Sequence, residues 1–317
     1  MNNKGSEKRK YCLIFNPSAG SGHAQRQWPA IEAILDSQSL DYTRRTTTAP
    51  GDAIAYTVAA AREGFDVIVA VGGDGTANEV INGLMRVQEE GISPPALGLI
   101  SVGRGNDFAH AVGLPMGIES AVKALAADRR RLIDIGHVVG GLYPQGRFFG
   151  NCVGVGFDAV GTIEAAKLPR LGGFLSFLIA VLKTILLYHH GPIVRLIYDD
   201  EELSQAVLMV SVMNGQRLGG GFWMAPKSAP DDGSFDICVV RQVPRWRVFT
   251  LVPHFLRGTQ ATQAEITMLK ACSIEVEALE GTLPAQTDGE ILSIDDRHLK
   301  IELMPGALAV VTLMETL

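Results

Sequence analysis

The residues with the clearest chemical potential form the segment Gly72-Gly73-Asp74-Gly75-Thr76. Three glycines around one aspartate allow the backbone to turn sharply and to approach a ligand closely. Unpaired backbone N–H groups in such a turn bind phosphate, and the carboxylate of Asp74 can bind a metal ion. Phosphate and metal together indicate a nucleotide. The alternative is a surface turn in which Asp74 caps a helix.

Two further loops rich in small residues follow apolar segments. Asn16-Pro17-Ser18-Ala19-Gly20-Ser21-Gly22 comes after Tyr11–Phe15, and Val102-Gly103-Arg104-Gly105-Asn106-Asp107 comes after Ala96–Ser101. Each loop is either another phosphate-binding element or an ordinary turn between a strand and a helix. The position of these loops relative to the first turn decides between the two interpretations.

The segments that flank the glycine loops predict a parallel α/β sheet. Val67–Val71 is apolar and mostly β-branched, which is typical of a strand buried on both faces. Val80, Ile81, Leu84 and Met85 have the spacing of an amphipathic helix. The carboxyl ends of parallel strands lie at one edge of a sheet, so we expect the three loops to converge there.

Two domains are predicted from the length of 317 residues and from a change of pattern near residue 138. After a disordered lead-in over residues 1–10, residues 11–138 are expected to form an α/β nucleotide-binding domain. Residues 139–305 contain short alternating apolar segments, which predict an antiparallel β-sandwich or a barrel-like second domain. Residues 306–317 contain an apolar strand that returns to either domain.

The predicted elements follow from these patterns. In the first domain we expect strands at Tyr11–Phe15, Val67–Val71, Ala96–Ser101 and Arg131–Ile135, and a further strand that ends at Thr46–Thr48. We expect helices through Trp28–Leu35, Ile54–Ala61, Val80–Met85 and Ile118–Ala127. In the second domain we expect strands at Phe148–Val155, Ile193–Tyr198, Val207–Val212, Phe235–Val240, Ile274–Ala278 and Leu299–Leu303, and a closing strand at Ala307–Met314 joins either domain.

One segment of the second domain, Leu171–Tyr188, predicts a helix with a wide apolar face. Lys183 and the early glycines leave an apolar stretch that is too short to span a membrane, because a spanning helix needs about 20 residues. The helix either packs over the sandwich core, or lines an acyl-chain cleft or contacts a bilayer surface.

The composition limits the class of partner. A formal net charge of −6 disfavours nucleic acid and general adsorption to anionic surfaces. Cys12, Cys152, Cys238 and Cys272 have no metal-binding spacing and are predicted to be buried free thiols in a reducing compartment. The N-terminus lacks the apolar segment of a signal peptide, so we expect a cytoplasmic location.

Five short segments with chemical potential occur in a fixed order: Asn16–Gly20, Gly72–Thr76 with Glu79, Gly105–Ala109, Pro230–Gly233 and Asp288–Glu290. This set resembles the motifs of the diacylglycerol kinase catalytic family, in its soluble bacterial lipid kinase branch. The resemblance covers nearly the whole chain from about Tyr11. The Asp-Gly pairs of the last two segments are, taken alone, also typical of hairpin turns.

The resemblance implies that ATP and its acceptor meet between an α/β lobe and a β-sandwich lobe. It implies Mg²⁺ as the cofactor, with Asp74 and Asp107 in the magnesium network. Glu290 would accept the proton of the acceptor hydroxyl, with Asp288 beside it, which suits phosphoryl transfer. The implied ATP contacts are Asn16, Pro17, Ser18, Ala19, Gly20, Thr47, Gly73, Asp74, Gly75, Thr76, Ala77, Asn78 and Glu79.

The resemblance also implies a structural Mg²⁺ that is held by Asp232 with the carbonyl groups of Ala229 and Ser234. It fails at Arg104, where the family has a threonine that serves the nucleotide phosphate. An arginine can bind phosphate, stack on the base or shift the bound nucleotide, so Arg104 receives no ATP role.

We therefore expect an ATP- and magnesium-dependent kinase that phosphorylates a lipid hydroxyl, with diacylglycerol as acceptor and phosphatidate as product. Peripheral contact with the inner membrane surface would accompany such an acceptor. Two alternatives stay open. One is a kinase of a soluble hydroxyl compound, such as an NAD kinase-like enzyme, which shares the GGDG turn. The other is a nucleotide-binding regulatory protein without turnover, which stays open because Arg104 stands where the family has a threonine.

Overall fold

The computed structural model describes residues 9–114, 116–167, 173–188 and 190–313, and the chain divides into two compact units. Asp107 belongs to the second unit, as do Asp288 and Glu290, whereas Asp74 belongs to the first. The first unit comprises Met1–Gly103, Gly113–Arg131 and Leu308–Leu317, and the second comprises Arg104–Val112 and Leu132–Ala307.

The first unit contains four parallel strands in the order β2-β1-β3-β4. Phe15 lies beside Thr46 and Val71, and Gly72 lies beside Ser101, so the four strands end at the same level. All six residues of β3 are buried, as the apolar sequence predicts. The strands are β1 (Lys10–Phe15), β2 (Asp41–Thr46), β3 (Val67–Gly72) and β4 (Ala96–Ser101).

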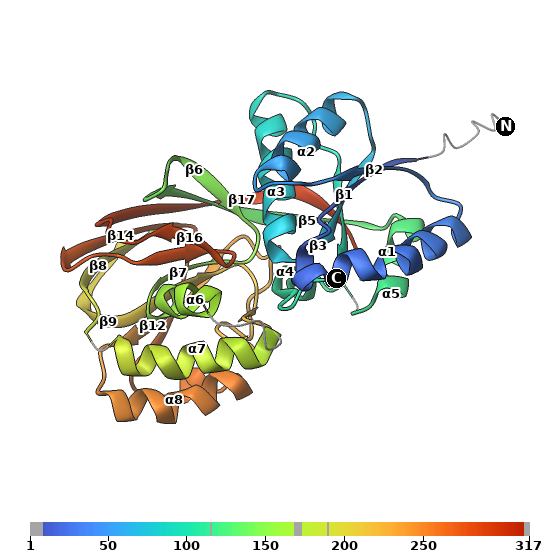
Figure 1. Ribbon diagram of the computed structural model, residues 1–317. Helices are drawn as coiled ribbons and strands as arrows, with labels where there is room; N and C mark the ends of the chain where they lie inside the picture. Colours follow the sequence, from blue (N-terminus) through green and yellow to red (C-terminus); the bar gives the residue numbers. More distant parts are fainter. Residues whose placement is uncertain (1–8, 115, 168–172, 189, 314–317) are drawn as a thin grey trace. The chain divides into compact units, whose positions relative to one another are not determined.

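Helices connect and cover these strands (Figure 1). The predicted amphipathic helix after the glycine turn is confirmed, because Val80, Ile81, Leu84 and Met85 are all buried. The helices of the first unit are α1 (Ala19–Ser37), α2 (Asp52–Arg62), α3 (Asp74–Glu89) and α5 (Ile118–Ala127).

The second unit is built mainly from antiparallel strands, which confirms the predicted α/β class with a parallel N-terminal part and an antiparallel C-terminal part. The main path is β16-β15-β7-β9-β8-β14-β17; β12 pairs with β9 and β13, and β5 pairs with β6 and β17. The strands of this sheet are β5 (Arg130–Gly140), β6 (Tyr143–Phe149), β7 (Cys152–Gly156), β8 (Ile193–Tyr198), β9 (Glu201–Met213), β12 (Phe235–Arg241), β13 (Ile266–Ala271), β14 (Ser273–Glu280), β15 (Ala285–Thr287), β16 (Glu290–Ser293) and β17 (His298–Val311). The short strands β10 (Arg217–Leu218) and β11 (Phe222–Trp223) pair with each other in a separate sheet.

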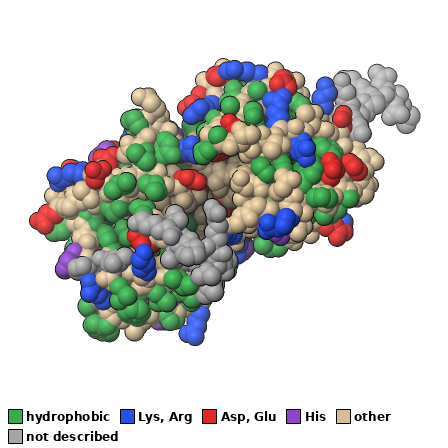
Figure 2. All heavy atoms as spheres, in the orientation of Figure 1, with side chains coloured by type: hydrophobic (Ala, Val, Ile, Leu, Met, Phe, Trp, Pro, Cys, Tyr) green, Lys and Arg blue, Asp and Glu red, His purple; other side chains and the backbone are tan. Residues whose placement is uncertain are grey.

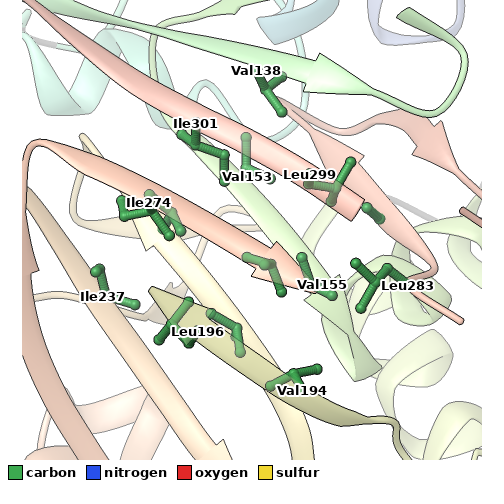
Figure 3. Packing of buried hydrophobic residues seen from close by; sticks show 14 of the residues in the cluster. Val138, Val153, Val155, Val194, Leu196, Ile237, Ile274, Leu283, Leu299 and Ile301 are labelled. Carbon is green, nitrogen blue, oxygen red and sulfur yellow. The ribbon is translucent and has the colours of Figure 1, made fainter. Parts of the chain in front are cut away.

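A core of aliphatic side chains fills the second unit (Figure 3). Val153, Leu196, Ile237, Ile274 and Ile301 come from five different strands and are buried in this cluster. Alternation of buried and partly buried residues along β8 and β14 places one face of each strand here, which is the pattern expected of a sandwich.

The predicted strand Phe148–Val155 is wrong, because the structure has two strands there, β6 and β7. The backbone N–H groups of Gly150, Asn151 and Cys152 donate hydrogen bonds to the carboxylate of Asp288. The N–H groups at the break between the two strands therefore bind a side chain, and the ladder is interrupted.

Strand β17 joins the two predicted strands Leu299–Leu303 and Ala307–Met314, as far as the described residues extend. Its first part pairs with β14 in the second unit, and Val310 pairs with Leu97 of β4 in the first unit. Gly306 interrupts the regular pattern with a left-handed φ of 58°. β17 is thus a single strand with residues in both units.

Three helices of the second unit share a second apolar cluster with the sheet: α6 (Phe157–Lys167), α7 (Gly173–Leu187) and α8 (Arg245–Arg257). α7 confirms the apolar helix predicted over Leu171–Tyr188, the start of which lies outside the described residues. α6 and α8 have no counterpart in the predictions. Within the described residues, every helix is too short or too polar to cross a membrane.

Three of the four cysteines, Cys12, Cys152 and Cys238, are buried free thiols as predicted. The prediction is wrong for Cys272, which is exposed between β13 and β14. Its thiol donates a hydrogen bond to the carbonyl of Gly233 at 3.1 Å.

Candidate active site

The loops that follow the parallel strands of the first unit begin at one edge of the sheet. The backbone N–H of Asn16 donates to the carbonyl of Val71 (3.0 Å), and that of Val102 donates to the carbonyl of Gly72 (2.8 Å). These bonds extend the pairing of β1, β3 and β4 into the loops. The predicted convergence of the three glycine loops is confirmed.

Glycine allows these loops to pack closely. A Cβ atom on Gly73 would lie 3.2 Å from the Cα of Gly103, and one on Gly20 would lie 2.7 Å from the carbonyl oxygen of Val102. Gly20 also has a left-handed φ of 60°, a conformation that glycine adopts most readily. Side chains at these positions would force the loops apart.

The side chain of Asn16 joins the first loop to α3. Its Nδ2 donates to Oγ1 of Thr76, and its Oδ1 accepts from the backbone N–H of Ser18, both at 3.0 Å. Asp74 is the first residue of α3 and follows Gly73, which occupies the N-cap position. The alternative that Asp74 caps the helix is therefore wrong, and its half-buried carboxylate lies at the glycine turn.

Glu79 binds the loop that precedes α2. Its two carboxylate oxygens accept hydrogen bonds from the backbone N–H groups of Gly51 (2.9 Å) and Ala53 (3.2 Å). Glu79 therefore fixes the loop after β2 beside α3.

The other predicted ATP contacts differ in how buried they are. At least partly exposed are Pro17, Ser18, Ala19 and Gly75, whereas the buried ones are Thr47, Thr76, Ala77 and Asn78.

In the second unit, Asp107 is the first residue of the short helix α4 (Asp107–Ala111) and is buried. Its Oδ1 accepts hydrogen bonds from Nε of Arg217 (3.0 Å) and from the backbone N–H of Gly220 (3.1 Å). The same backbone N–H of Gly220 also donates a hydrogen bond to Oδ2 of Asp107 (3.1 Å). Asp107 therefore already has a cationic partner within its own unit.

Asp288 is also buried and accepts three backbone hydrogen bonds. Oδ2 binds the N–H of Gly150 (2.9 Å), and Oδ1 binds those of Asn151 (3.0 Å) and Cys152 (2.9 Å). Asp288 and Gly289 both have left-handed φ angles, 47° and 87°, and form the turn between β15 and β16. The hairpin interpretation is thus correct for the backbone, while the Asp288 side chain anchors the turn to the β6–β7 connection.

Arg217 and Asn151 connect the two aspartates. Nε of Arg217 binds Asp107, and the carbonyl of Arg217 accepts a hydrogen bond from Nδ2 of Asn151 at 3.1 Å. The backbone N–H of Asn151 in turn binds Asp288. Sequence reasoning missed both residues; the available signal was the glycine run Gly219–Gly221, which follows Arg217 as glycines surround the other motifs.

Glu290 begins β16 directly after this turn, and it is exposed. Its position leaves the carboxylate accessible to a reactant, as a general base requires. Gln286 ties the turn from the other side, because its Oε1 accepts a hydrogen bond from the N–H of Gly289 at 2.8 Å.

The predicted structural metal site lies at the turn before β12. Oδ1 of Asp232 accepts hydrogen bonds from the N–H (3.1 Å) and the hydroxyl (3.0 Å) of Ser234, and Oδ2 lies 2.6 Å from Nζ of Lys270. The carbonyl of Ala229 accepts the N–H of Asp232 (3.3 Å). The Lys270 ammonium supplies the positive charge at Asp232, so an Mg²⁺ ion there would have to displace it.

An apolar cavity lies beneath α6, α7 and α8 in the second unit. Among the described residues that line it, Asp158 alone has a polar side chain; the others include Leu208, Phe222 and Leu251. Burial raises the pKa of Asp158 to about 6, although hydrogen bonds from Ser211 (3.0 Å) and Gln286 (3.4 Å) oppose the shift. Since Gln286 also binds Gly289, the cavity wall is linked to the turn that carries Glu290.

The chain is similar to known kinases over nearly its whole length. Residues 10–138 match the diacylglycerol kinase catalytic domain, and residues 151–312 match the YegS C-terminal NAD kinase beta sandwich-like domain. A diacylglycerol kinase of Bacillus subtilis is 29% identical over 302 residues, which cover 92% of this chain and 95% of the relative.

Two further similarities agree with this result. A Pseudomonas aeruginosa protein named "Probable lipid kinase YegS-like" is 32% identical over 305 residues, 96% of this chain and 94% of the relative. A crystal structure of a diacylglycerol kinase from Bacillus anthracis matches with a TM-score of 0.73 at 26% identity and covers 98% of both chains.

Proposed function

The chain belongs to the diacylglycerol kinase catalytic-domain family and is an ATP-dependent lipid kinase, and we propose that it phosphorylates the free hydroxyl of diacylglycerol to give phosphatidate. The observation that carries the choice of a lipid with acyl chains is the apolar cavity of the second unit. Asp158, the one polar side chain among the described residues of its wall, is connected through Gln286 to the turn that bears Glu290. An acyl chain in this cavity would place its polar end toward that turn.

In the first unit, the converging glycine loops are the proposed binding site for the ATP phosphates. Such loops offer backbone N–H groups, and the N-terminus of α3 adds the positive end of a helix dipole. Asn16 and Glu79 hold the loops in register through the bonds to Thr76, Ser18 and Gly51.

We assign the magnesium-binding role to carboxylates, since Mg²⁺ prefers oxygen ligands. Asp74 fits this role because its carboxylate lies at the glycine turn. Asp107 fits it less directly, because Arg217 and Gly220 already bind its oxygens. When bound, Mg²⁺ would neutralise charge on the phosphates during transfer.

Glu290 is the proposed general base, which takes the proton from the acceptor hydroxyl as the oxygen bonds to the γ-phosphorus. The bond between the γ-phosphorus and the β–γ bridging oxygen breaks in the same transfer, and ADP leaves. Its exposure permits contact with the acceptor, and Asp288 holds the turn that presents it. A positioned base of this kind typically contributes about 10²–10⁴ in rate.

The test uses ATP labelled in its γ-phosphate, Mg²⁺ and a panel of acceptors that includes diacylglycerol and NAD. We expect labelled phosphatidate, with the rate lowered about 10²-fold or more in Glu290→Gln. Asp74→Ala should lower it by a similar factor, because it removes charge stabilisation at the phosphates. Glu302→Gln is the matched control, since Glu302 is another exposed glutamate on a strand of the same unit.

Parent-like rates in both Glu290→Gln and Asp74→Ala would contradict the assigned roles. Transfer to NAD without lipid would instead support a soluble acceptor, a candidate that the NAD kinase-like class of the C-terminal domain favours. Binding of ATP with Mg²⁺ but no product from any acceptor would support a regulatory protein without turnover.

A further inference from the structure

The outer side of α8 exposes large aromatic residues. Trp246 is 68% exposed and Phe249 is 43% exposed, although Val248 and Leu251 on the inner side are buried in the second apolar cluster. Trp246, Phe249 and Pro253 follow a spacing of three and four residues and therefore lie along one side of the helix. A monomeric protein surface has no structural need for a row of exposed apolar side chains in this position.

α7 continues this apolar surface. Leu182 and Leu186 are 41% and 62% exposed, while Val181 and Ile185 of the same helix are buried in the cluster that also holds the inner side of α8. The two helices run beside each other in Figure 1, and Figure 2 shows hydrophobic side chains gathered over their region with Lys and Arg at its margin. We call Leu182, Leu186, Trp246, Phe249 and Pro253, with Arg245 and Arg257, the outer helical face.

The charge of the outer helical face differs from that of the whole chain. The sequences of α7 and α8 contain no Asp or Glu, whereas the chain has a net charge of −6. Arg247 is paired with Glu265 through two hydrogen bonds of 3.0 Å, and Arg245 and Arg257 are exposed at the two ends of α8. Arg245 lies in the first turn, where a cation opposes the helix dipole, so helix stability does not explain it.

We propose that the outer helical face is the surface by which the protein docks on an anionic lipid bilayer. A helix that lies in the interface has an aromatic and aliphatic side toward the acyl chains and arginines near the lipid phosphates, and α8 has both. The proposal rests on the proposed function, because a diacylglycerol acceptor resides in a bilayer. It adds the surface that makes the contact.

The experiment measures binding to phosphatidylcholine vesicles with and without phosphatidylglycerol, by co-sedimentation and in the absence of ATP. We expect binding only to the anionic vesicles, with a decrease at high salt. Trp246→Ser/Phe249→Ser should lower the partition coefficient about tenfold or more, since two aromatic side chains leave the interface. Arg245→Gln and Arg257→Gln should each lower it about fivefold, the equivalent of about 1 kcal/mol per basic residue.

Leu142→Ser is the matched control, because Leu142 is 63% exposed in the β5–β6 turn, outside the outer helical face. It should bind as the parent does, and Trp246→Phe should retain most of the binding. Brominated lipids should quench the tryptophan emission of the parent more than that of Trp246→Ser. This quenching reports contact of Trp246 with the lipid. Circular dichroism of each variant checks separately that its fold is retained.

Parent-like binding of Trp246→Ser/Phe249→Ser would overturn the proposal. The proposal would also be overturned if the parent were a dimer and the same double variant a monomer with unchanged vesicle binding. A second copy of the chain would then cover the outer helical face. Vesicle binding can be measured without turnover, so the two proposals can fail separately. Loss of vesicle binding in Trp246→Ser/Phe249→Ser, with intact kinase activity on a micellar acceptor, supports the docking surface. Intact vesicle binding of the parent without phosphatidate formation contradicts the proposed function alone.

Discussion

Asp158 is an acidic residue that is buried among apolar side chains, an environment in which carboxylates are rare. Its carboxylate is buried in the wall of an apolar cavity, and only the side chains of Ser211 and Gln286 are within hydrogen-bond distance of it among the described residues. Burial therefore raises the pKa to about 6 from an ordinary 3.8. Such a group binds its proton more tightly in the folded state than in the unfolded state.

The pKa of Asp158 predicts how stability changes with pH. Since the folded pKa is above the unfolded value, the free energy of unfolding should fall as pH rises through the window from about 4 to about 6, by on the order of 3 kcal/mol. Asp158→Asn should remove this decrease and be more stable than the parent at pH 7. Chemical denaturation across this range measures it, with the exposed Asp295→Asn as the control. Parallel pH profiles for the parent and Asp158→Asn would contradict the prediction.

Arg217 is the residue whose role is hardest to see in the sequence, because its partner Asp107 is 110 residues away. Its guanidinium positions Asp107 by a charged hydrogen bond, and such bonds contribute about 1.5–3 kcal/mol. Arg217→Met should therefore lower kcat/KM about 10-fold to 100-fold, and Arg217→Lys should restore part of the loss. Steady-state kinetics at several Mg²⁺ concentrations test this, with the exposed Arg241→Gln as the control.

A purely structural role for Arg217 would lower the melting temperature and leave the kcat/KM of the folded enzyme unchanged. A positioning role changes kcat/KM and its Mg²⁺ dependence in the folded enzyme. The two outcomes are therefore separable by measuring both quantities on the same variants.

At the scale of elements, sequence patterns identify the strands and helices with regular apolar spacing. β3, α3 and α5 lie where the pattern places them, because their buried faces are continuous. α8 was missed since exposed Trp246 and Phe249 obscure the contrast between its two faces. The glycine loops and acidic turns were found because glycine and aspartate are local signals, whereas Arg217, Asn151 and Gln286 act through contacts that only the tertiary fold creates.

The turn before β12 yields a prediction about the structural cation. If Asp232 binds Mg²⁺, Lys270→Met should strengthen that binding, because it removes the ammonium 2.6 Å from the carboxylate. Mg²⁺ should then raise the melting temperature of Lys270→Met more than that of the parent, and Asp232→Asn should abolish the effect. An equal response of all three proteins to Mg²⁺ would show that Asp232 does not bind the ion.

At the scale of the whole molecule, the chain forms two compact units, and the end of β17 belongs to the first. Leu308, Val310 and Val311 are buried, so the last described strand is part of the packing beside β4. The likeness to the matched families spans both units, at residues 10–138 and 151–312. The boundary predicted near residue 138 took no account of Arg104–Val112, which cluster with the second unit.

Strand β17 therefore links the stability of the nucleotide unit to the C-terminal residues. Val310→Ala should destabilise the first unit by about 2 kcal/mol, because it leaves a space beside Leu97. An ATP analogue should protect the same unfolding transition that Val310→Ala lowers. Val276→Ala, in the core of the second unit, is the control and should lower the other transition; a shift of that transition by both variants would contradict the assignment.

The route of β17 also has a consequence for synthesis on the ribosome. The residues that pair with β4 leave the exit tunnel after the whole second unit, although β4 itself emerges early. An edge of the nascent sheet thus stays open while about two hundred further residues are translated, at a pace of about 5–20 residues per second. The part of the chain that is made first is accordingly the part that is closed last, and during that interval its β4 edge is available to ribosome-associated chaperones and to neighbouring nascent chains.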